Sequence, residues 1–138
     1  MIIYFDFNYS ISDEPRILPI IIKLSFSDNF ISSISSYIQC PGSMQNASLA
    51  LKMYDKSMEP LISKNTYVYV ALNIPLNHRD IGIFLYNNKI IIRRFLIRKN
   101  GLVLKPENNE YFDIKLLEKD NFTIIGKALG TGENGPIK

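Results

Sequence analysis

Short runs of apolar and β-branched residues, separated by turn residues, dominate the chain from Ser48 onward. Runs of four to eight such residues bounded by turn signals are typical of β-strands. The ranges that we interpret as strands are 49–54, 66–72, 80–86, 89–97, 102–105, 111–116 and 122–129. Asn87 and Asn88 tolerate the positive φ of a tight hairpin turn, and Lys99-Asn100-Gly101 marks the next turn. The pattern predicts a compact, mostly antiparallel β domain.

The first 37 residues have a different pattern, and we interpret residues 1–37 as an amino-terminal extension. Polar residues interrupt its first part, which predicts an extended arm followed by a strand over Leu18–Leu24. From Asp28 to Ile38 apolar residues recur at helical spacing, which favours one short helix with Ser27 as its cap. Serine is a mediocre helix former, so a strand or a loop remains an alternative there. The main domain is then expected over residues 38–130.

The glycine-rich tail, residues 131–138, is predicted to be flexible. The chain's 138 residues are 46% hydrophobic and 21% charged, which is typical of one globular domain. Its net charge of +3 is mild, and Lys and Arg are spread along the chain. Direct nucleic-acid binding is therefore not indicated. The one local basic concentration, at Arg93, Arg94, Arg98 and Lys99, fits a solvated strand face or a phosphate contact.

Cys40 is the only cysteine, so an intramolecular disulfide and a metal site built on several thiolates are excluded. No metal or other cofactor is expected. The apolar runs are far shorter than the roughly 20 residues that span a bilayer, and the first residues lack the features of a signal peptide. We therefore expect a cytoplasmic protein that does not enter a membrane. Residues 1–47 offer at most one helix, so no helix-turn-helix is expected.

The segment 49–62 carries the candidate chemistry. Its strand leads to Ser57-Met58-Glu59-Pro60, in which Pro60 prevents a helix from beginning at once. Such a turn exposes a hydroxyl at the end of a strand, where functional groups are often held. A turn serine before a proline is the simpler explanation of the same four residues.

The order of motifs along the chain favours a functional role for Ser57 over a simple turn serine. It resembles the LexA-like peptidase domain that is found in LexA, in UmuD and in many phage repressors. The motifs that carry the resemblance are Ser57–Pro60, Leu61-Ile62, Tyr67–Ala71, Arg79–Phe84, Ile90–Phe95, Leu102–Tyr111 and Phe122–Ala128. They cover roughly residues 38–130 in unbroken order. Each motif is weak alone, but the ordered set is specific.

The resemblance implies a serine–lysine dyad that cleaves the chain's own upstream segment. Ser57 matches the nucleophile, and Met58 and Pro60 match its motif. A lysine among apolar groups can lose its charge and act as the base. Arg93 falls at the position of that lysine, and an arginine cannot be deprotonated in a protein. We therefore interpret the chain as a degenerate member.

Two other residues could supply a base. Lys89 shares the strand parity of Arg93, but it lies about 13 Å further along the strand. We keep it as the fallback base. His78, the only histidine, lies in an expected loop, where a solvated side chain is the simpler explanation.

The expected cleavage site also departs from the family's pattern. Family members are cut at a small pair, usually Ala-Gly, and the matching residues here are Phe26 and Ser27. A phenylalanine would fill a pocket shaped for a methyl group. Cys40-Pro41-Gly42 contains small residues, but a proline after the scissile residue would block attack. Both departures indicate that self-cleavage is lost.

Two classes of function follow from the resemblance. The first is a regulatory domain in transcription or the SOS response, which forms a homodimer or binds a repressor and no longer cleaves itself. An exposed strand edge near Phe122–Leu129 would suit such pairing. The alternative is an active serine–lysine self-processing peptidase of the UmuD kind. The chain could also be the excised carboxy-terminal part of one repressor.

Overall fold

A computed structural model describes residues 16–23, 33–40, 44, 46–132 and 135–137, and all their regular structure is β. The strands are β1 (Arg16–Lys23), β2 (Ser33–Cys40), β3 (Leu49–Lys52), β4 (Tyr67–Leu72), β5 (Ile81–Tyr86), β6 (Lys89–Arg98), β7 (Gly101–Lys105), β8 (Ile114–Lys115), β9 (Phe122–Thr131) and β10 (Gly135–Pro136). No helix in these ranges is long and apolar enough to cross a membrane. The predicted mostly β fold is confirmed.

The turns between neighbouring strands follow the local sequence. Asn87 and Asn88 adopt φ angles of 46° and 69°, and they join β5 to β6 as an antiparallel hairpin. Positive φ at both central residues is what a two-residue hairpin requires, so this predicted turn is confirmed. Gly101 has a φ of 133° at the next turn, where β7 begins and pairs back onto β6. Only glycine adopts that φ without strain.

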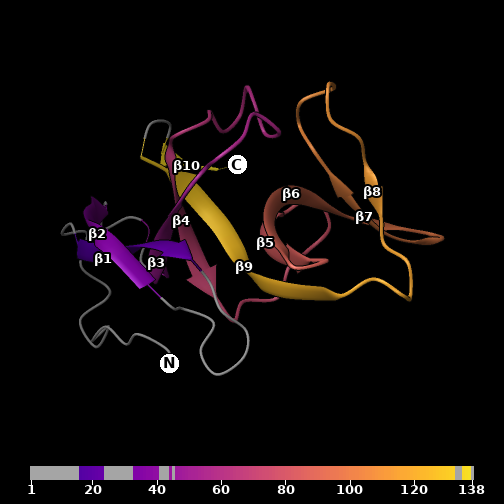
Figure 1. The fold of residues 1–138 in the computed structure, drawn as a ribbon, viewed down its shortest axis with the longest axis horizontal. Coiled ribbons are helices and arrows are strands. Elements are labelled where there is room, and N and C mark those ends of the chain that lie inside the picture. The colour runs from indigo at the N-terminus through magenta and orange to yellow at the C-terminus, as the bar shows by residue number, and fades with distance from the viewer. Residues whose placement is uncertain (1–15, 24–32, 41–43, 45, 133–134, 138) are drawn as a thin grey trace.

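Strand β9 joins the two halves of the sheet. The strand order is β2-β1-β3-β4-β9-β5-β6-β7-β8, and β10 pairs with β9. In Figure 1, β9 runs from beside β4 at the centre of the molecule to the β5–β6 side. Its first part pairs with β5 and its last part with β4. The expected exposed strand edge near Phe122–Leu129 is therefore covered in part: β5 pairs along residues 122–127 and β4 along residues 126–131, so residues 122–125 are paired on one side only.

The amino-terminal strands extend one half of the sheet. The predicted strand at Leu18–Leu24 corresponds to β1, which pairs parallel with β3 and antiparallel with β2. The predicted short helix is wrong for residues 33–38, which belong to β2, and residues 28–32 lie outside the described ranges. Serine is a poor helix former, so an isolated helix of this segment would be marginal. Pairing with β1 satisfies the backbone hydrogen bonds of the segment as a strand instead. In the expected flexible tail, Gly135 and Pro136 form β10 and pair with β9.

Three buried clusters fill the space on the two faces of the sheet. The central cluster combines side chains from β3 to β6 and β9 with three from the turn after β3: Leu49, Leu51, Met53, Met58, Ile62, Val68, Val70, Ile81, Ile83, Ile92, Ile125 and Ala128. A second cluster lies around Leu18, Ala50 and Tyr69, and a third around Phe84 and Phe95. Alternate residues of β3 enter different clusters, because neighbouring side chains of a strand point to opposite faces.

Candidate functional site

The turn after β3 holds the candidate serine. Backbone hydrogen bonds from Met53 N–H to Thr66 O (2.8 Å) and from Asn65 N–H to Met53 O (2.6 Å) close its base. Within the turn, the Ile62 N–H donates to the carbonyl of Met58 at 2.9 Å. Met58 is fully buried in the central cluster, whereas Pro60 is exposed and follows a cis peptide bond. The buried methionine anchors the turn and thereby fixes the residue before it.

Ser57 is fully buried and lies in a short hydrogen-bonded chain. Its Oγ–H donates to Oδ1 of Asp55 at 2.6 Å, and Nη1 of Arg93 donates to its Oγ at 2.7 Å. The Ser57 N–H also donates to the same Asp55 oxygen, at 3.0 Å. An arginine cannot accept and a carboxylate cannot donate, so this arrangement fixes the direction of the hydroxyl proton. The proton points to Asp55 and away from residue 93.

Arg93 comes from β6 and is 7% exposed. Its Nη1 also donates to the Ile92 carbonyl at 2.8 Å, while its buried Nε has no hydrogen-bond partner. Burial lowers the pKa of the guanidinium from its ordinary value, and the negative charge of Asp55 acts in the opposite direction. A guanidinium stays protonated in a protein even so. Arg93 is therefore a buried cation, held by hydrogen bonds and by a carboxylate that contacts the same hydroxyl.

The loop between β7 and β8 covers this cation. The guanidinium carbon lies 5.9 Å from the centre of the Tyr111 ring, within the range of a cation–π interaction. Asn108 donates from its N–H to the Ser57 carbonyl at 3.0 Å and from Nδ2 to the Lys56 carbonyl at 2.9 Å. The loop therefore clamps the serine turn.

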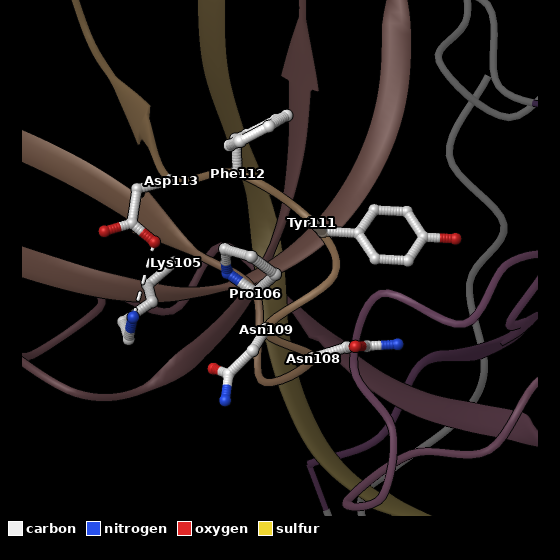
Figure 2. Close-up of a pocket in the computed structure, with 7 residues that line it drawn as sticks. All are labelled: Lys105, Pro106, Asn108, Asn109, Tyr111, Phe112 and Asp113. Carbon is white, nitrogen blue, oxygen red and sulfur yellow. Dashed lines mark hydrogen bonds and ion pairs between the residues drawn. The ribbon is translucent and has the colours of Figure 1, made fainter.

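A pocket lies in the same loop. Its lining is Lys105, Pro106, Asn108, Asn109, Tyr111, Phe112 and Asp113. Figure 2 shows the ion pair of Lys105 with Asp113 at one side of the loop and the Tyr111 ring pointing to the other. Ser57 and Arg93 do not line this pocket, so the opening does not give direct access to the serine.

The remaining sequence candidates lie elsewhere. Lys89 is exposed at the start of β6 and hairpin-paired with Tyr86, four residues from Arg93. His78 is exposed, and its Nδ1 accepts a hydrogen bond from the Ile97 N–H at 2.9 Å. Phe26 and Ser27 lie outside the described residues. The structure therefore brings Ser57 and Arg93 together, and it does not bring Lys89 or His78 to them.

Three residues of the site were missed in the sequence: Asp55, Asn108 and Tyr111. Asp55 had a local signal, because an Asp side chain often accepts the N–H of the second residue after it. Asn108 and Tyr111 had none, since the clamp joins residues 52 positions apart, Lys56 and Asn108.

The chemical capacity of the arrangement is narrow. The hydroxyl of Ser57 has a donor, Arg93, on one side and a carboxylate acceptor on the other, and the arginine at the position of the family's base cannot accept a proton. Within the described ranges, no group of three or more His, Cys, Asp or Glu side chains could hold a metal ion. The side chains present can hold the hydroxyl firmly in one orientation.

Comparison with known proteins identifies a family and a curated relative. A family model described as Peptidase S24-like matches residues 19–129. The LexA repressor of Acetivibrio thermocellus is 30% identical over 76 residues, which make up 55% of this chain and 35% of that repressor. The chain is thus matched to about a third of the length of this curated relative.

Proposed function

Because this chain belongs to the Peptidase S24-like family, we propose that it is a LexA-type regulatory domain that associates with a protein partner and no longer cleaves itself. The partner is a second copy of the chain or a repressor with a similar domain. The similarity to a LexA repressor supports the regulatory role.

One observation carries the loss of self-cleavage: Arg93 donates to the Oγ of Ser57 at 2.7 Å. Activation of a serine requires a group that accepts its proton. The arginine at this position can only donate. The full burial of Ser57 supports the same conclusion, because a peptide bond would have to displace its neighbours to reach Oγ.

The alternative is an active self-processing peptidase of the same family. It would need another base, and Lys89 is the nearest candidate along β6. Its exposure on the surface differs from the apolar surroundings in which a lysine serves as a base. The family match alone keeps this alternative as the second candidate.

Incubation at alkaline pH tests the loss of cleavage. We expect the unaltered protein to keep its intact mass during a day at pH 9–10, where a dyad lysine would be increasingly neutral. Mass spectrometry of the intact chain is the measurement. Cleavage that Ser57→Ala abolishes would contradict the proposal, and Lys89→Ala would then be the first variant to make.

Association is the second expectation of the proposal. Exposed apolar side chains in β9 and in the segment before it include Ile124 and Leu117, and we expect them to contribute to a dimer. Ile124→Lys should weaken the dimer by about tenfold or more, because it places a charge in an apolar contact. Sedimentation velocity from low to high micromolar concentration measures this. Thr123→Lys, at the exposed neighbouring residue, is the charge-matched control.

A monomer at high micromolar concentration that also fails to bind a repressor with a Peptidase S24-like domain would contradict the association. An equal effect of the two lysine substitutions would show that the added charge, and not the Ile124 contact, weakens the dimer.

A further inference from the structure

The side chain of Asp55 has a role that the lost lysine alone does not explain. It lies in the turn after β3, two residues before Ser57, and one of its oxygens accepts both the Oγ–H and the N–H of that serine. We infer that Asp55 is a second cause of inactivity at this site. It would keep even a lysine at position 93 charged, and it would keep the Ser57 proton turned away from that lysine. This inference rests on the proposed loss of self-cleavage and deepens it.

The first inhibitory effect of Asp55 is geometric. For nucleophilic attack, the Ser57 proton has to pass to a base, so the hydroxyl must donate to that base. The hydroxyl donates to Asp55 at 2.6 Å, and a charged acceptor holds such a hydrogen bond more strongly than a neutral amine does. Replacing Arg93 with a neutral base would therefore leave Ser57 bonded to the wrong partner.

The second inhibitory effect of Asp55 is electrostatic. The ionisable groups that face Arg93 are Asp55 and Tyr54 from the turn and Tyr111 from the loop after β7. Asp55 is the largest of these charge influences, and only the loss of solvent acts more strongly on the pKa of Arg93. The hydroxyl of Tyr54 is held by the Ile90 carbonyl at 3.0 Å, and burial raises its pKa. Asp55 is thus the negative charge that compensates a cation at residue 93.

The sign of the effect follows for a lysine at residue 93. A nearby carboxylate stabilises the ammonium form and raises the lysine's pKa, whereas burial lowers it. Removing the carboxylate therefore lowers the pKa, and the neutral base becomes populated at a lower pH. The hydrogen bond to Asp55 does not activate the serine as a neutral lysine would, because a carboxylate is in general a much weaker base than an amine.

The test compares Arg93→Lys with Arg93→Lys plus Asp55→Asn. Asparagine has the size of aspartate and can still accept from the Ser57 N–H. The pKa of the introduced lysine is measured by NMR titration of carbon-13-labelled lysine side chains, in which the signal absent from the unaltered protein identifies it. We expect Asp55→Asn to lower this pKa by about one unit or more. Glu118→Gln, at an exposed residue between β8 and β9, removes the same charge and should leave it nearly unchanged.

A second pair of variants guards against misfolding of the first. Ser57→Cys, with and without Asp55→Asn, keeps Arg93, and thiolate absorbance gives the pKa of the introduced thiol. Cys40 is common to both proteins and cancels in the comparison. We expect Asp55→Asn to lower the thiol pKa as well, because it removes a negative charge beside the thiolate.

An unchanged lysine or thiol pKa in folded protein overturns the inference while leaving the proposed function in place. Self-cleavage by the unaltered protein contradicts the proposed function and does not alter either titration. A merely structural Asp55 would lower stability on replacement but would not shift both pKa values in this direction.

Discussion

Arg93→Met is expected to lower the free energy of unfolding by about 3 kcal/mol, because it removes a buried cation together with two hydrogen bonds that it donates. Methionine is apolar and fills much of the same space, so the loss does not come mainly from a cavity. The substitution removes the hydrogen bonds to Ser57 and Ile92 and leaves the Asp55 carboxylate without its cation. Urea denaturation followed by fluorescence or circular dichroism measures the change.

Two further variants define the cause of that loss. Arg98→Met makes the same exchange at an exposed residue of β6 and should change stability by less than about 0.5 kcal/mol. Adding Asp55→Asn to Arg93→Met should restore part of the stability, because the uncompensated charge disappears. If the double variant is as unstable as the sum of the two single changes, Asp55 and Arg93 are not coupled in the way described.

Self-cleavage should be regained by a variant with three changes: Arg93→Lys, Phe26→Ala and Ser27→Gly. The first supplies a group that can lose its proton, and the other two supply the small pair that the family resemblance implies. We expect slow cleavage between residues 26 and 27 only at high pH, near pH 10, where part of the lysine becomes neutral even beside Asp55, about tenfold or more above the same protein with Ser57→Ala. Intact mass over several days is the measurement, and the fragment masses give the position of the cut.

Each change has its own control. Arg93→Lys alone should stay largely intact, because its substrate residues are wrong, and Phe26→Ala with Ser27→Gly should stay intact, because it has no base. Adding Asp55→Asn to the triple variant should move the onset of cleavage to lower pH. A triple variant that folds and remains uncut even with Asp55→Asn would contradict the alignment that places Arg93 at the base.

Most of the sheet could be predicted from the sequence because its signals are local. Apolar runs and turn residues define the strands from β3 to β9, and Asn87-Asn88 defines a hairpin by its backbone preference alone. The prediction of a helix at residues 33–38 was wrong because the spacing of Ile34, Tyr37 and Ile38 also fits a helix. Pairing with β1, a contact outside that window, decides between the two.

The site was predictable only in part, because some of its contacts join residues that are far apart in the sequence. Ser57 and Arg93 were identified from the order of motifs, which gives chain position but not contacts. Asp55 was within reach of local reasoning, since a spacing of two residues is enough for its side chain to bond the backbone. Tyr111 packs on Arg93 only through the tertiary fold, so no window of sequence around either residue could have indicated it.

The placement of β9 has a consequence for synthesis. Chains emerge from the ribosome amino-terminus first, and β4 and β5 are made long before β9, although β9 lies between them in the sheet. Until residues 122–131 have been made, the hydrogen-bonding groups along the sides of β4 and β5 that β9 covers have no partner, and the two halves cannot join. A nascent chain of this protein therefore offers two open strand edges to chaperones, or to other nascent copies, from the completion of β5 at Tyr86 until β9 is completed at Thr131.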